Sequence, residues 1–175
     1  MAGTDIIRTA DHDADSPRPG GPRELLIRID DLRGPEIAAL LEEHLEDMRA
    51  TSPPESNHAL DLDGLRKPEI TFWTVWDGDA LVGCGAIKEL DPTQAEIKSM
   101  RTAAAHRGRG VASAMMTRIL DEAARRGYRR LSLETGSGEF FAPARALYGK
   151  LGFEACPPFA DYWDDPNSYF MTRAI

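Results

Sequence analysis

Residues 107–112, Arg-Gly-Arg-Gly-Val-Ala, lie where a strand-like segment, Glu96 to Thr102, gives way to a helix-like segment, Val111 to Arg126. The first turn of a helix leaves backbone N–H groups without intrahelical partners, and the helix dipole puts partial positive charge at the same end. Glycines there remove the Cβ atoms that would hold a phosphate away, while Arg107 and Arg109 add fork-shaped cationic donors. This junction predicts a strand-to-helix turn that binds a pyrophosphate-bearing ligand.

Two familiar phosphate loops do not match this junction. A nucleotide-hydrolase loop ends in Gly-Lys-Ser/Thr, and Val111 and Ala112 supply neither the lysine nor the hydroxyl. A dinucleotide-binding loop needs Gly-x-Gly-x-x-Gly, and Ser113 stands at the third glycine position. The alternative to a ligand site is an ordinary glycine-containing turn with two solvated arginines.

Composition narrows the class of protein. The 175 residues are 42% hydrophobic, which suits a single domain with a sizeable core. No apolar run approaches the roughly 18 residues that span a membrane, and the N-terminus lacks the apolar core of a signal peptide, so we expect a cytoplasmic protein with no membrane partner. The net charge of −8 argues against a nucleic-acid partner and is compatible with a cationic amine substrate. Cys84 and Cys156 have neither metal-ligand nor disulfide spacing, so we expect no metal.

The hydrophobic pattern predicts one domain, residues 24–175, behind a mobile N-terminal tail, residues 1–23. Asp77-Gly78 between two strand-like runs predicts a hairpin, and Gly127 predicts a left-handed cap at a helix end. The expected strands are 24–30, 70–76, 80–90, 94–102, 128–135 and 168–172, and the expected helices are 35–50, 111–126 and 141–151, with a short helical turn in 60–65.

Two motifs in this order resemble the Gcn5-related N-acetyltransferases, the GNAT family. Arg107-x-x-Gly110-x-Ala112 is similar to the family loop Arg/Gln-x-x-Gly-x-Gly/Ala, and Ala144 to Phe153 contains the second motif, which ends in Tyr-x-x-x-Gly-Phe. The resemblance covers the chain from about Leu25 to the C-terminus. It implies a single α/β (α+β) domain with a mixed, mostly antiparallel sheet of about six to seven strands, helices on both faces and a splayed central strand pair.

The resemblance also implies that acetyl-CoA is the acyl donor. The pyrophosphate would bind the loop that consists of Arg107, Gly108, Arg109, Gly110, Val111 and Ala112. The pantetheine would pair with the backbone of Met100, Arg101 and Thr102, and a donor near Met100 would stabilise the oxyanion. An asparagine that binds pantetheine in many family members is replaced here by Phe141.

Tyr148 and Glu96 are the expected catalytic residues. A phenol can return a proton to the departing thiolate, so Tyr148 would be the general acid, with a purely structural core tyrosine as the alternative. Glu96 stands where histone-modifying family members place a base, and it competes for this role with Glu134 and with water. The alternative to a catalytic role for Glu96 is a surface ion pair with Lys98. Strand alternation predicts that one face carries Glu96, Lys98, Met100 and Thr102, and the other face carries Ile97, Ser99 and Arg101.

The acceptor is expected to bind between the segments Thr51 to Lys67 and Pro157 to Phe170, with His58 and Glu134 as substrate-binding residues. The acidic and basic side chains of these two segments suit a small zwitterion such as an amino acid. We therefore predict direct transfer of an acetyl group to a primary amine of a small metabolite, since neither motif offers a cysteine for a covalent intermediate. A protein-lysine acetyltransferase and a non-catalytic CoA-binding module are the alternatives. The resemblance, which is to small bacterial members of mostly unsettled substrate, also allows a homodimer.

Overall fold

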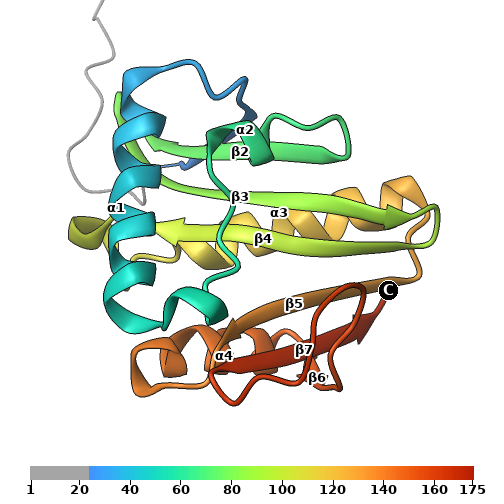
Figure 1. Ribbon diagram of the computed structural model, residues 1–175. Helices are drawn as coiled ribbons and strands as arrows, with labels where there is room; N and C mark the ends of the chain where they lie inside the picture. The colour runs from blue at the N-terminus through green and yellow to red at the C-terminus, as the bar shows by residue number, and fades with distance from the viewer. Residues whose placement is uncertain (1–23) are drawn as a thin grey trace, which may run out of the picture.

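Seven strands form one sheet in the order β1-β2-β3-β4-β5-β7-β6 (Figure 1). The computed structural model describes residues 24–175, and the predicted tail, residues 1–23, lies outside the described residues. Every neighbouring pair is antiparallel except β4 with β5, which is parallel. The strands are β1 Leu26–Ile29, β2 Ile70–Asp77, β3 Ala80–Asp91, β4 Gln94–Thr102, β5 Arg130–Gly136, β6 Glu154–Ala155 and β7 Ser168–Ala174.

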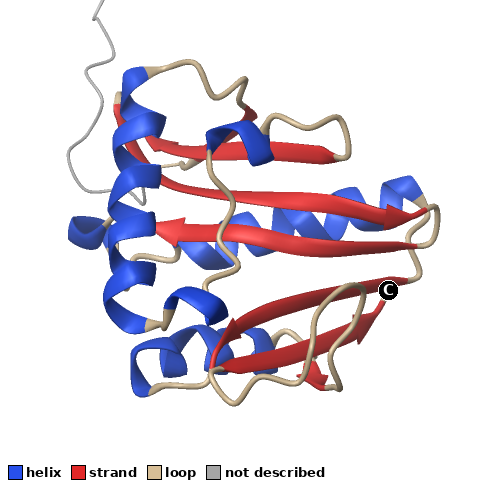
Figure 2. Ribbon diagram, in the orientation of Figure 1, coloured by secondary structure: helices blue, strands red, loops and turns tan. Residues whose placement is uncertain are grey.

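Helices cover both faces of the sheet (Figure 2). On one face lie α1, Pro35–Thr51, and α2, Leu62–Leu65; on the other lie α3, Val111–Arg126, and α4, Ala142–Lys150. Short 3-10 turns are formed by Pro54–Ser56, Ala104–His106 and Glu139–Phe141. The mixed sheet covered on both faces confirms the predicted fold class.

The helices begin and end where the local chemistry predicts. In α1, Pro35 occupies the first turn, where its missing N–H costs nothing, and the helix stops just before Pro53. In α3, Gly127 caps the C-terminus with a left-handed φ of 78°. The remaining predicted elements match in type and order, and only the two-residue strand β6 was missed, because it is too short to carry an alternation pattern.

Two apolar clusters hold the layers together. The larger lies between the sheet and the α3 and α4 helices and includes Trp73, Met116 and Ile119, all fully buried. The smaller packs α1 and α2 on the other face, with Ile37 and Phe72 among its buried members. These clusters anchor the strands that carry the functional residues. None of the helices between residues 24 and 175 is long and apolar enough to cross a bilayer.

The two central strands separate halfway along their length. Pairing between β4 and β5 runs from Gln94 opposite Arg130 to Ile97 opposite Leu133 and then stops, although both strands continue. The splayed strand pair implied by the family resemblance is therefore present. Beyond Ile97, the edge of β4 that faces β5 pairs with no strand among residues 24–175.

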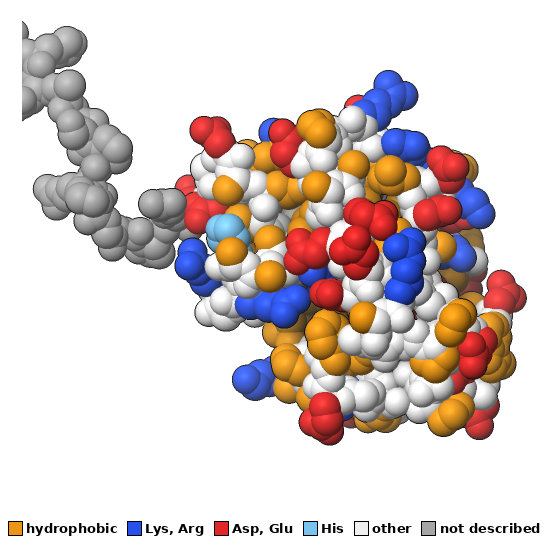
Figure 3. All heavy atoms as spheres, turned by 60° about the vertical axis from the view of Figure 1, so that its left-hand side comes forward, with side chains coloured by type: hydrophobic (Ala, Val, Ile, Leu, Met, Phe, Trp, Pro, Cys, Tyr) orange, Lys and Arg blue, Asp and Glu red, His pale blue; other side chains and the backbone are white. Residues whose placement is uncertain are grey.

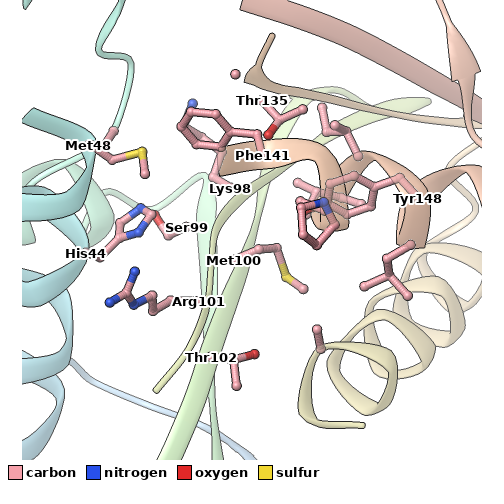
Figure 4. A pocket seen from close by; sticks show the side chains of 18 of the residues that line it. His44, Met48, Lys98, Ser99, Met100, Arg101, Thr102, Thr135, Phe141 and Tyr148 are labelled. Atoms are coloured by element: carbon pink, nitrogen blue, oxygen red, sulfur yellow. The ribbon is translucent and has the colours of Figure 1, made fainter. Parts of the chain in front are cut away.

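A bulge in β4 corrects the predicted assignment of side chains to faces. Ser99 has a φ of 54°, and the register with β3 shifts between Cys84 and Ala86, so that two residues of β4 oppose one of β3. Because the extra residue reverses the alternation, Met100 points toward α3 and Arg101 toward α1, as Figure 4 shows. The prediction that Met100 and Thr102 share a face with Glu96 and Lys98 was wrong for this reason.

Candidate active site

A cavity of about 580 Å³ lies where β4 and β5 separate. Its walls come from α1, the 56–59 loop, the ends of β4 and β5, the first turn of α3, and α4 with the 3-10 turn before it (Figure 4). Of the predicted site residues, the cavity is lined by His58, Met100, Arg101, Thr102, Arg107, Gly108, Gly110, Val111, Ala112, Glu134 and Tyr148. Glu96 and Arg109 do not line it.

The N-terminus of α3 forms one end of this cavity. Gly110, the N-cap, has a φ of 80°, Gly108 has a φ of 74°, and no side chain caps the first turn. A Cβ added at either glycine would meet no atom within 4 Å, so the space above the first-turn N–H groups is open. Arg107 stands beside it with its guanidinium 3.7 Å from Asp47 of α1. Free N–H groups, a helix dipole and an arginine give this end the chemistry of an anion site.

Arg101 is tied to the scaffold by its side chain. Its guanidinium is buried and donates hydrogen bonds to Glu43 and Asp47 of α1. The side chain is therefore engaged away from the gap between the strands. Arg101 nevertheless lines the cavity, between Met100 and Thr102.

Tyr148 reaches the cavity from α4. The ring is buried and packs edge-on against Phe153 with centroids 6.0 Å apart, and no other described residue hydrogen-bonds the hydroxyl. Burial raises the pKa of this phenol well above its ordinary value. The hydroxyl is therefore protonated at neutral pH and can donate a proton into the cavity.

The two candidate bases occupy different environments. Glu96 is only 3% exposed, and its Oε1 accepts hydrogen bonds from Lys98 Nζ at 2.9 Å and from the Tyr162 hydroxyl. Glu134 lines the cavity, and burial raises the pKa of its carboxyl, while the charge of Lys98 opposes the shift. The structure thus brings Glu134, and not Glu96, to the cavity wall. The expected ion pair of Glu96 with Lys98 exists, but it is buried and not on the surface.

Two loops meet at the other end of the cavity. His58 packs edge-on against Tyr162 and Trp163, with ring centroids 5.0 Å apart in each pair. The amide of Asn167 donates to Ser56 Oγ at 3.2 Å. These contacts join the segments 51–67 and 157–170, both of which the sequence assigned to the acceptor side, although no residue of 157–170 lines the cavity itself. Burial, with the nearby charge of Lys98, lowers the pKa of His58, so its imidazole is neutral at pH 7.

Several cavity residues were missed by sequence reasoning. His44 and Met48 of α1 line the cavity, and burial together with Arg101 lowers the pKa of His44 to about 4. A histidine one turn after Leu40 on the apolar helix face was the available signal, but the periodicity alone marks that position as core. Within residues 24–175, four buried polar atoms of residues that line the cavity have no hydrogen-bond partner: His44 Nδ1, His58 Nε2, Ser99 Oγ and Arg101 Nε. They leave hydrogen-bonding capacity for a ligand.

The surface around this region is mixed in charge. On the face brought forward in Figure 3, acidic, basic and hydrophobic side chains are interspersed. Between residues 24 and 175, no group of three or more His, Cys, Asp or Glu side chains is placed to hold a metal ion.

Comparison with known proteins identifies the family. The model of the acetyltransferase (GNAT) family matches residues 37–153, a span that contains both sequence motifs and most of the cavity wall. The chain belongs to the GNAT family. It is accordingly an acetyl-CoA-dependent acyltransferase, and the predicted family and enzyme class are confirmed.

Relatives of this GNAT enzyme agree in length and fold. YsnE of Bacillus subtilis, an uncharacterised N-acetyltransferase, is 58% identical over 149 residues, which cover 85% of this chain and 99% of the relative. A Klebsiella pneumoniae structure assigned as an acyl-CoA N-acyltransferase superposes with a TM-score of 0.72 at 27% identity, covering 86% of this chain and 97% of that one. An Elizabethkingia anophelis GNAT acetyltransferase with acetyl-CoA bound has the same fold, with a TM-score of 0.60 at 15% identity and coverage of 86% and 98%.

One position departs from the GNAT pattern. Phe141 stands where the resemblance implies an asparagine in many members, and its ring lies so close to Gly136 that a Cβ there would be 2.1 Å from the ring. Phe141 also contacts Phe140 edge-on, with centroids 5.0 Å apart. An apolar ring therefore lines the cavity beside the end of β5, where the family places an amide.

Proposed function

We propose that this GNAT enzyme transfers the acetyl group of acetyl-CoA to a primary amine of a small metabolite by direct attack. The observation that carries the proposal is the continuity of one cavity. It runs from the anion site at the α3 N-terminus, past Tyr148, to Glu134 and His58. A donor and an acceptor bound at its two ends would meet where β4 and β5 separate.

The residues at the donor end fit acetyl-CoA. The open space above Gly108 and Gly110, the uncapped first turn of α3 and Arg107 suit a pyrophosphate. The unpaired edge of β4 after Ile97 offers backbone groups to the amide groups of pantetheine. When bound, acetyl-CoA supplies an activated thioester carbonyl, and the protein supplies position and proton transfer. Arg109, which is exposed and outside the cavity wall, can contribute only to the long-range positive field.

Glu134 is the proposed base, directly or through a water molecule. A protonated amine cannot attack a thioester, and a carboxylate on the acceptor side of the cavity can remove the proton. Glu96 is a poorer candidate than the sequence suggested because Lys98 and Tyr162 already occupy its Oε1. In this proposal Tyr148 donates a proton to the leaving sulfur, and a backbone N–H group near Met100 stabilises the oxyanion.

Closure of the acceptor end favours a small substrate over a protein lysine. The contacts of His58 with Tyr162 and Trp163, and of Asn167 with Ser56, join the two loops above that end. A lysine within a folded protein would have to part these loops. We therefore place a free metabolite amine ahead of a peptide acceptor.

The test is a measurement of thiol release from acetyl-CoA with a broad panel of small amines and a lysine-containing peptide. Small amines are expected to raise thiol release above hydrolysis, and mass spectrometry should find the N-acetylated product. Glu134→Gln and Tyr148→Phe are the active-site controls. An increase in thiol release with the peptide but with none of the small amines, or no increase above hydrolysis with any acceptor, would refute a small-metabolite acetyltransferase.

A further inference from the structure

Lys98 and Glu134 are the first residues beyond the point where the central strands part. Ile97 and Leu133 form the last register pair of β4 and β5, so Lys98 and Glu134 stand next in register. Residues in register on parallel strands share a face, and both of these line the cavity. Among the described contacts, no ion pair joins the two side chains. A cation and a carboxylate from neighbouring strands thus line the same cavity without pairing with each other.

Lys98 is held rigidly by its neighbours. Its Nζ donates to Glu96 Oε1 and to the Tyr162 hydroxyl, each at 2.9 Å, and lies 5.6 Å from the Tyr162 ring centroid. The side chain is only 10% exposed. An ammonium group has three N–H donors, and the described residues take two of them. The third is available to a ligand in the cavity that Lys98 lines.

Glu96 does not cancel this cation completely. Its Oε1 is shared between Lys98 and the Tyr162 hydroxyl, so part of its charge is taken up by the phenol. The charge of Lys98 acts on the pKa of both His58 and Glu134, and on each of them it outweighs the opposing charge of Glu96, while Asp165 also opposes it. An anionic group of the acceptor would meet the charge of Lys98 together with the unpartnered His58 Nε2 and Ser99 Oγ.

We propose that the acceptor is an α-amino carboxylate, with its carboxylate bound by Lys98 and its amine directed to Glu134. The proposal rests on the amine acetyltransferase function proposed above and names the substrate class of that site. An α-amino acid carries its ammonium and carboxylate on one carbon atom, so it presents both charges close together. The adjacent Lys98 and Glu134 offer the complementary pair.

The experiment compares amino acids with the amines that lack only the carboxylate. The matched pairs are phenylalanine with phenethylamine, tryptophan with tryptamine, and leucine with isoamylamine. For the unmodified enzyme we expect kcat/KM to favour the carboxylated member of at least one pair by about tenfold or more, mainly through KM. Lys98→Met should abolish that preference. Lys150→Met, an exposed lysine of α4, should keep it.

A second variant separates recognition from folding. Lys98→Met leaves Glu96 buried without its cation, so the double variant Lys98→Met/Glu96→Gln removes both charges together. The preference for the carboxylate should be lost in this variant as well. Three outcomes would overturn the proposal while leaving the amine acetyltransferase intact. The unmodified enzyme could show equal kcat/KM within every pair, or it could acetylate only the amines that lack a carboxylate. The preference for the carboxylate could also survive in the double variant. Failure of the whole amine panel would overturn both.

Discussion

At the residue scale, Tyr148 combines burial with a hydroxyl that no other described residue engages. A phenol is protonated throughout the neutral range, and burial, which raises its pKa, keeps Tyr148 in that form, so it holds a proton for the departing thiolate. We expect Tyr148→Phe to lower kcat by about 100-fold, the scale of general acid catalysis. Steady-state thiol release measures this change.

Binding and stability provide the control for Tyr148→Phe. The substitution keeps the ring and its edge contact with Phe153, so the dissociation constant of CoA and the urea midpoint should stay close to those of the unmodified protein. A phenylalanine variant that retains full kcat would show that Tyr148 is only a core tyrosine.

Glu134 should set the acidic limb of the pH–rate profile. Its carboxyl has a pKa raised above 4.5 by burial, and the proposed base must be deprotonated to act. Activity should therefore fall as the pH drops through that raised pKa and be restored above it. In Glu134→Gln this limb should disappear and kcat/KM at pH 7.5 should fall by about 100-fold. A profile of kcat/KM from pH 5 to 9, for both proteins, tests whether Glu134 is the base. An unchanged acidic limb in the variant would exclude it.

At the scale of elements, the N-terminus of α3 is the feature that the sequence predicted most directly. Gly110 adopts a left-handed conformation there, and Gly127 does the same at the other end of the helix. Replacing either glycine by alanine should cost about 1 kcal/mol of unfolding free energy, because a Cβ is unfavourable at these φ values. Only Gly110→Ala puts a methyl group into the proposed phosphate cradle.

The two helix-end variants therefore form a matched pair. We expect Gly110→Ala to raise the dissociation constant of CoA by about tenfold or more, whereas Gly127→Ala should leave it unchanged. Titration calorimetry with CoA and urea denaturation measure the two effects separately. Similar losses of CoA affinity in both variants would mean that the loop acts only through helix stability.

At the scale of the whole molecule, Arg101 joins β4 to α1. Its buried guanidinium pairs with Glu43 and Asp47, which are partly exposed, and Asp47 also faces Arg107 of the anion site. Arg101→Met should lower the free energy of unfolding by about 2 kcal/mol, because two charge-assisted hydrogen bonds are lost. Urea denaturation measures this change in the free energy of unfolding.

The control is Arg49→Met, which removes an ion pair whose two side chains are both exposed, and it should change the free energy of unfolding by less than about 0.5 kcal/mol. Equal effects in the two variants would contradict a special role for Arg101.

What the sequence determined by itself was local. The first-turn glycines of α3, the hairpin at Asp77-Gly78, the cap at Gly127 and the motif around Tyr148 depend on backbone preferences within a few residues, so their patterns could be read directly. The order of these elements then supplied the GNAT resemblance and the parting of β4 and β5. These predictions were confirmed.

Only the tertiary structure decided which side chains meet in the cavity. The bulge at Ser99 reverses the faces of Met100 and Arg101, and a one-residue slip leaves no mark in the alternation that precedes it. Lys98 and Tyr162, 64 residues apart, together enclose Glu96, while Glu134 remains at the cavity wall. Such long-range pairing depends on how the C-terminal loop packs across the sheet. A single sequence carries the residues for that packing but not the distances between them.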